Sequence, residues 1–162
     1  RRWKQGSKGG DTAMAKATQQ TQPNLIRVCA DGMDGGEISG LAYTMFDAVP
    51  IAFSDTWDLL RRCDRFFDWI DYPQPALTRR HFGPAARTPA ADPQQVATEQ
   101  QLLQRVGRAL TFFLAVDTRR AATWQGRVIL PDRELHFSSE LELYRKLKAL
   151  SHAHISAEDK KE

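Results

Sequence analysis

The sequence predicts an α+β fold made from one β-β-β-α unit used twice in tandem, with antiparallel sheets related by a pseudo-twofold axis. Two stretches share one pattern: a glycine within a strand, a Phe-Ser pair and then an apolar helical segment. The first copy occupies 38–40, 52–55 and 57–70, and the second occupies 124–126, 136–139 and 141–150. A unit of about fifty residues is marginal in burial on its own, so we expect the two units to fold against each other.

The first unit is expected at 24–73. β-rich runs at 24–30, 37–46 and 50–54 are separated by short turns, of which 31–36 is rich in glycine, and this spacing favours an antiparallel meander. Asp55, followed three residues later by Asp58, is typical of an acidic helix cap. The helix should end before Pro73. Residues expected on its buried face have helical spacing: Trp57, Leu60, Cys63, Phe67 and Ile70.

The second unit is expected at 108–150. Alternating apolar residues predict strands at 110–117 and 124–130, and a shorter strand at 135–137. Ser139 and Glu142 form the matching helix-cap signature. The apolar side of the following helix should carry Leu141, Leu143, Tyr144, Leu147 and Leu150.

Gly40 and Gly126 lie at the same place in the second strand of each unit. A glycine there weakens a sheet unless another group needs the space. We expect the helix of each unit to pack closely over it, and the close approach of a ligand is the alternative.

The remaining segments are predicted to be connectors and tails. A proline-rich connector spans 74–107, with helix-like spacing at 96–106. Residues 1–23 read as a loose tail, of which 1–13, before Met14, resemble a translated leader or added sequence. Residues 151–162 are polar and are expected to fray.

The positive charge of the chain is concentrated at its beginning. Residues 1–20 contain five basic side chains and one acidic side chain, whereas the other 142 residues contain 18 basic and 19 acidic ones. The predicted folded part is therefore nearly neutral, which disfavours a general affinity for nucleic acid. No apolar run approaches the length of a membrane span.

The sequence contains no recognisable catalytic or metal-binding motif. A nucleophile elbow, a phosphate loop, a His-Glu-x-x-His helix and a dinucleotide-binding glycine pattern are all missing. Cys29 and Cys63 are too few for a disulfide framework or a metal knuckle, and both are expected to be core thiols. We therefore predict a non-enzymatic protein without catalytic residues, metal or cofactor.

Two sets of residues are candidates for binding a partner. The first is an aromatic group that would contact another protein, although Trp124 is also a candidate for the core: Trp69, Tyr72, Trp124 and Gln125. The second set is basic and would bind phosphates if the chain bound nucleic acid through its strands and connector. Its members are Arg79, Arg80, His81, Arg119, Arg120 and Arg127, and Arg27 could assist them.

One motif resembles a signature of small uncharacterised bacterial proteins. It consists of Ala122-Thr123-Trp124-Gln125-Gly126 followed by Phe137-Ser138-Ser139-Glu140-Leu141-Glu142-Leu143, with Ser138 in place of the family's basic residue. The segment 53–73 is similar to a second set of such proteins, so the chain resembles two related types in tandem. The resemblance implies a bacterial cytoplasmic protein and brings no activity or catalytic residue.

The leading functional hypothesis is a cytoplasmic protein-interaction or assembly module. Duplication, a near-neutral folded part and the lack of a catalytic motif favour self-association or binding to another protein. Nucleic-acid binding is the alternative, and a small-ligand or enzymatic role is third, without residues to carry it.

Overall fold

The computed structural model describes residues 22–74, 93–119 and 123–160. Within these residues the fold is α+β: a six-stranded antiparallel sheet with strand order β3-β2-β1-β4-β5-β6, accompanied by three helices. The α+β class and the antiparallel sheet were predicted from the sequence and are confirmed. The expected leader at 1–13 and much of the proline-rich connector lie outside the described residues.

The first half contains β1 (Leu25–Asp34), β2 (Glu37–Thr44), β3 (Ile51–Phe53) and α1 (Thr56–Ile70). The predicted turn at 31–36 is wrong in extent, because β1 continues to Asp34. Only Gly35 and Gly36 form the turn, with φ angles of 57° and 84°, as a two-residue hairpin of the primed type requires. Asp31 forms a β-bulge between Ala30 and Gly32.

The connector and second half contain α2 (Glu99–Leu103), β4 (Leu110–Thr118), β5 (Gln125–Ile129), β6 (Glu134–Phe137) and α3 (Glu140–Asp159). The prediction of a frayed tail from 151 is wrong, since α3 continues through that segment. Ser151 is fully buried, and the tip of the β1–β2 hairpin at Gly36 approaches His152. Tertiary contact therefore stabilises this part of α3, although its polar sequence did not indicate a helix.

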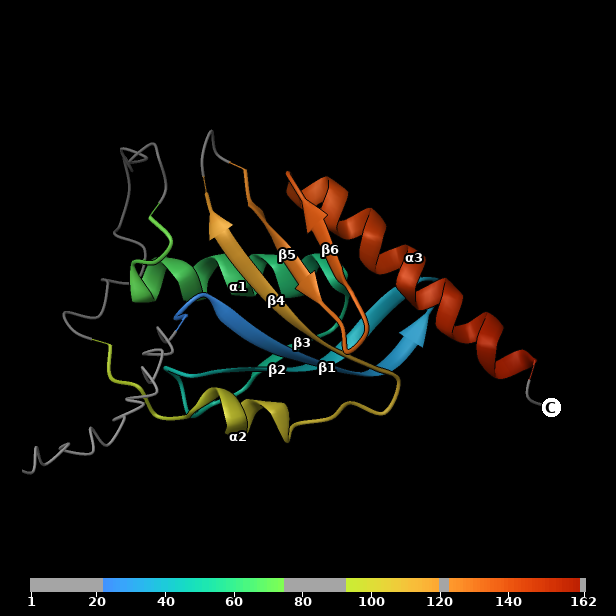
Figure 1. The fold of residues 1–162 in the computed structure, drawn as a ribbon, viewed down its shortest axis with the longest axis horizontal. Coiled ribbons are helices and arrows are strands. Elements are labelled where there is room, and N and C mark those ends of the chain that lie inside the picture. Colours follow the sequence, from blue (N-terminus) through green and yellow to red (C-terminus); the bar gives the residue numbers. More distant parts are fainter. Residues whose placement is uncertain (1–21, 75–92, 120–122, 161–162) are drawn as a thin grey trace, which may run out of the picture.

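The main core lies between the sheet and the two long helices. Figure 1 shows α1 and α3 on the same side of the sheet, with α3 extending past the strands. Side chains on this side of the two central strands are fully buried, including Ile26, Val28, Phe112 and Leu114. Alternation along a strand places these residues on one face, and for β4 this alternation was predicted from the sequence.

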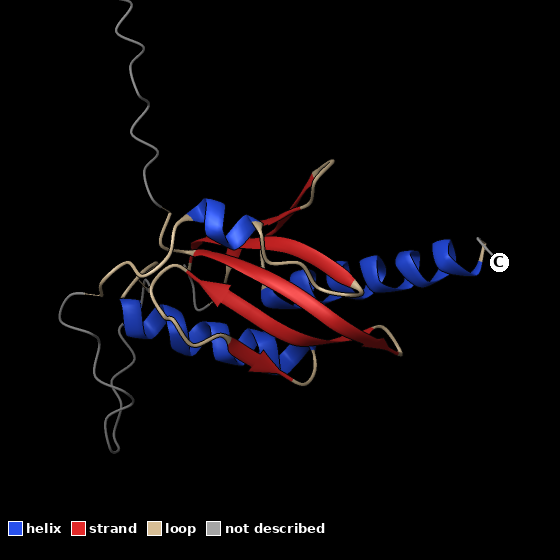
Figure 2. Ribbon diagram, turned by 90° about the horizontal axis from the view of Figure 1, so that it is seen from below, coloured by secondary structure: helices blue, strands red, loops and turns tan. Residues whose placement is uncertain are grey.

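The opposite sheet face carries a smaller core beneath α2. Leu102 of α2 packs with Leu25, Met45, Phe113 and Ala115. Figure 2 shows the sheet between this short helix and the two long ones. The two central strands are thus covered on both faces, which explains why Phe113 and Ala115 are buried although they alternate with the main-core residues of β4.

Gly40 and Gly126 each leave room for the neighbouring strand. A Cβ atom on Gly40 would lie 2.2 Å from the carbonyl oxygen of Cys29, and one on Gly126 would lie 2.1 Å from that of Ala115. The Cβ of residue 126 would also lie 2.9 Å from the Phe137 ring. The close approach that was expected from the helix is made instead by the sheet, to which the nearest atoms belong.

Candidate interaction surfaces

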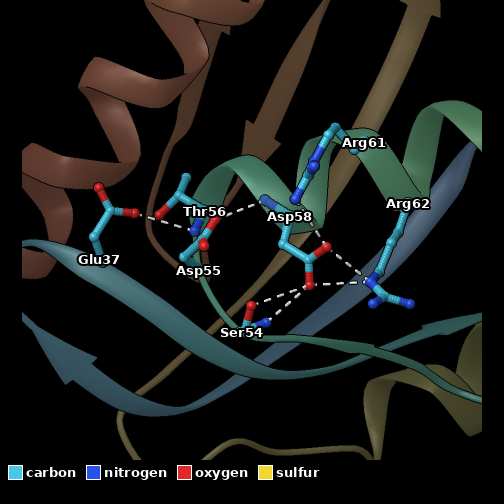
Figure 3. A network of polar contacts seen from close by, with 7 residues as sticks. All are labelled: Glu37, Ser54, Asp55, Thr56, Asp58, Arg61 and Arg62. Atoms are coloured by element: carbon cyan, nitrogen blue, oxygen red, sulfur yellow. Dashed lines mark hydrogen bonds and ion pairs between the residues drawn. The ribbon is translucent and has the colours of Figure 1, made fainter.

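The start of α1 is held by a network of polar contacts. The Asp55 carboxylate caps the helix by accepting a hydrogen bond of 2.7 Å from the Asp58 backbone N–H. The Asp58 carboxylate accepts from the Ser54 backbone N–H at 3.1 Å and from Arg62 Nε at 3.0 Å. Figure 3 shows this carboxylate between Ser54 and Arg62. The predicted cap is confirmed, and Asp58 is buried.

The hydrogen bonds to Asp58 also set its charge state. The backbone N–H of Ser54 is the main cause that lowers the pKa of the Asp58 carboxyl, and Arg62 lowers it further against the opposing effect of burial. Asp58 is therefore an ionised part of the helix start.

Glu37 connects the network to α3. One carboxylate oxygen accepts from the Thr56 backbone N–H at 3.1 Å, and the other accepts from the Tyr144 hydroxyl. Burial alone would raise the pKa of the Glu37 carboxyl, but the hydrogen bonds from Tyr144 and Thr56 lower it overall. The same contact raises the pKa of the Tyr144 hydroxyl. Glu37 is thus an ionised link between the two long helices.

The start of α3 repeats the arrangement at the start of α1. Glu142 accepts hydrogen bonds from the Ser138 backbone N–H at 3.0 Å and from its hydroxyl at 2.7 Å. The Glu142 N–H donates to Ser139 Oγ at 3.1 Å, and Lys146 lies 3.5 Å from the Glu142 carboxylate. The predicted cap at Ser139 and Glu142 is confirmed.

An exposed apolar spot lies where the two long helices meet. Trp57 is 43% exposed and stacks on Tyr144 with ring centroids 4.8 Å apart. Leu141, one turn before Tyr144 on α3, is 48% exposed. The expectation that Trp57 belongs to the core is wrong, because the buried face of α1 runs through Leu59 and Leu60 and leaves Trp57 at its margin. The spacing at 59, 60, 63, 66, 67 and 70 was the signal for this face.

The aromatic residues predicted to bind a partner do not form one surface. Tyr72 is 44% exposed, but Trp124 is only 3% exposed and packs edge-on against Phe67. Trp69 is half-buried against the main core. The Gln125 side chain, also half-buried, accepts a hydrogen bond from the Thr118 hydroxyl and donates to Thr123 Oγ1. Trp124 is thus a core residue, and only Tyr72 of this set is largely exposed.

The described arginines proposed for phosphate binding are engaged within the chain. Arg119 is 5% exposed and lies 2.6 Å from the Asp68 carboxylate and 3.3 Å from that of Asp64. Its Nε donates to the Pro73 carbonyl at 2.6 Å. The prediction that Arg119 contacts nucleic acid is therefore wrong: it joins the end of β4 to α1.

The other described arginines that were predicted to bind phosphate do not form a basic face. Arg127 lies 3.2 Å from Asp117 and 3.6 Å from Glu134. Arg27 donates to the carbonyls of Arg105 and Leu103, and its guanidinium lies over the Phe113 ring. The remaining candidates lie outside the described residues: Arg79, Arg80, His81 and Arg120.

An open groove of about 470 Å³ lies between the end of β2 and α2. Its lining includes Tyr43, Asp47, Val96 and Arg105, and the Arg105 guanidinium already covers the Tyr43 ring at 4.8 Å. Neither histidine nor cysteine lines this groove. In the part of the chain that the structure describes, no group of three His, Cys, Asp or Glu side chains is arranged to hold a metal ion.

Both cysteines are buried and unbonded. Burial raises the pKa of the Cys63 thiol strongly, and burial is also the main cause that raises the pKa of the Cys29 thiol. Neutral thiols are poor nucleophiles and poor metal ligands. The prediction that both cysteines are core residues is confirmed.

Comparison with known proteins adds no relative to these observations. No protein-family profile, no curated protein and no solved structure matches the chain significantly. Across residues 22–74, 93–119 and 123–160, no helix has both the length and the apolar character needed to cross a bilayer.

Proposed function

We propose that this chain is a non-enzymatic protein-interaction or assembly module, derived from a β-β-β-α unit that pairs through its strands. The single observation that carries the proposal is the register of the β1–β4 junction. If Gly40 is aligned with Gly126, Arg27 is equivalent to Phe113, and these two residues are register partners. In the same alignment Ile26 is equivalent to Phe112, and Leu114 is equivalent to Val28. Ile26 pairs with Leu114, and the equivalent residues Phe112 and Val28 also pair with each other. Such reciprocity is typical of an isologous twofold contact.

Three further matches support duplication of the unit. Gly40 pairs with Phe53 as Gly126 pairs with Phe137. The bulge at Asp31 next to Gly40 corresponds to the bulge at Asp117 next to Gly126. Both helices begin with an acidic side chain that accepts from the N–H and hydroxyl of the serine four residues before it. Bulges and caps are specific local features, so their joint repetition supports a common origin.

The way in which the two halves are joined supports an assembly role. One antiparallel ladder between equivalent strands links them, and the same kind of contact can form between separate chains through edge strands. The sheet still has two such edges, β3 and β6. A bacterial cytoplasmic setting, which the family resemblance implies, is part of this proposal.

Capture of partners by the full chain tests the proposal. Immobilised wild-type protein would be compared with a variant carrying Ala52→Lys and Glu134→Lys, one change on each edge strand, because lysine at an edge opposes strand pairing. A control variant would carry Ala149→Lys and Val106→Lys, at exposed positions away from both edges. Defined partners, including further copies of the chain, should bind to wild type and control but be lost with the edge variant. Equal binding by all three, or no binding by any, would overturn the proposal.

A further inference from the structure

The two edges of the sheet differ in how well they are protected against pairing. β3 is three residues long and follows Pro50, which lacks an N–H. β6 has four residues, none of them proline, and within the described chain it pairs only with β5. An unprotected edge presents N–H and C=O groups to a further strand. The β6 edge is therefore the more open of the two.

The side chains of β6 divide between its two faces. Leu135 is half-buried and packs against the main core. Glu134 and His136 project on the opposite face, where their side chains are 45% and 74% exposed. Consequently a strand that pairs with β6 would bring its own side chains next to one acidic group and one imidazole.

We propose that a second copy of this chain pairs with β6, antiparallel and about a twofold axis at Leu135, so that two sheets become one. This register places Glu134 of each copy directly opposite His136 of the other, giving two pairs of a carboxylate with an imidazole. A twofold axis at His136 would instead place the two imidazoles together. The inference rests on the proposed assembly function and names its partner as another copy of the same chain.

Neighbouring charges favour this register. His136 lies opposite Arg127 on β5, and Arg127 is itself close to Asp117 and Glu134. Within one chain the His136 imidazole lies 3.9 Å from the Glu134 carboxylate. In the paired state it gains the second copy's carboxylate on its open side.

Sedimentation of the full chain tests the inference, in a concentration series up to about 1 mM at pH 6. Wild type should form a dimer. His136→Glu places Glu opposite Glu and should weaken the dimer about tenfold, in line with the usual size of two cross-strand pairs. The double variant Glu134→His/His136→Glu restores the pairing of Glu with His and should recover dimer formation. Ala52→Lys on β3 is the matched control and should leave the dimer unchanged.

The outcomes separate this inference from the broader proposal. A chain that stays monomeric, or a dimer whose strength is unchanged by both His136→Glu and the double variant, overturns pairing at β6. A dimer that is lost only with Ala52→Lys would place the interface at β3. That result also overturns pairing at β6, but it leaves the proposed assembly function in place. If the chain does not self-associate but captures a different protein through an edge strand, pairing of two copies at β6 is overturned and the assembly function remains. Circular dichroism of each variant confirms that the fold is retained.

Discussion

The two long helices begin in the same way but contribute differently to the core. Each starts after a Phe-Ser pair with a capped acidic turn. Aligning those pairs makes Phe67 of α1 equivalent to Ser151 of α3, and both side chains are fully buried. Phe67 contacts Trp124, which immediately precedes β5 in the second half, with ring centroids 5.4 Å apart. The cap thus defines where a helix begins, whereas the size of the buried side chains determines how much it stabilises the fold.

Truncating the equivalent buried residues should give the largest difference between the helices. Phe67→Ala should lower the free energy of unfolding by about 3–5 kcal/mol, because it removes a buried ring and leaves a cavity between the halves. Ser151→Ala should leave stability unchanged or raise it by up to about 1 kcal/mol, since the buried Ser151 hydroxyl has no hydrogen-bond partner among the residues that the structure describes. Urea denaturation followed by fluorescence and circular dichroism measures both. Comparable losses in the two variants would show that the helices contribute equally.

Replacing the equivalent glycines tests the feature that the two halves share. Gly40→Ala and Gly126→Ala should each cost about 1–3 kcal/mol, because the new methyl group would overlap a carbonyl oxygen of the adjacent strand. Gly126→Ala should be the worse, since the Phe137 ring is also close. At Gly126 the direction of the change is decisive, because without this crowding alanine would stabilise a strand by about 0.5–1 kcal/mol. At Gly40 the φ angle of 158° adds strain to any substitution. A gain in stability in either variant, measured by thermal or chemical unfolding, would contradict the packing seen at that glycine.

The sequence predicted best where local chemistry is strong. The helix caps at Asp55 and Ser139, the end of α1 before Pro73 and the burial of Phe112 and Leu114 follow from side-chain type and spacing alone. These features depend on neighbours within a few residues, so a single sequence contains the information. The strand alternation is of the same kind.

Features that depend on distant partners could not be predicted. The sequence alone suggests that Arg119 is a solvent-exposed basic residue. In the fold it lies next to Asp64 and Asp68 of α1. Residues 151–159 look like a polar tail in the sequence, but α3 continues through them and the tip of the β1–β2 hairpin lies close to His152. The edge pair Glu134 and His136 carries no motif, because its significance depends on β6 being the last strand of the sheet.

The smallest expected difference concerns acid stability at the two helix caps. Hydrogen bonding to Ser54 lowers the pKa of Asp58, and hydrogen bonding to Ser138 lowers the pKa of Glu142. A carboxyl whose pKa is lower in the folded chain stabilises the fold above its ordinary value, which is 3.8 for Asp and 4.5 for Glu. That contribution disappears as the pH falls through the lowered pKa. Unfolding should therefore become easier below about pH 4.

The two caps should differ because their exposure differs. The Asp58 side chain is 11% exposed, whereas the Glu142 side chain is 41% exposed and its charge is screened by water. Asp58→Asn should cost about 1 kcal/mol at pH 7 and should flatten the loss of stability between pH 5 and 2. Glu142→Gln should change that profile less. Urea midpoints measured across this pH range compare the two variants with wild type, and a larger effect at Glu142 would show that the exposed cap, not the buried one, dominates the acid response.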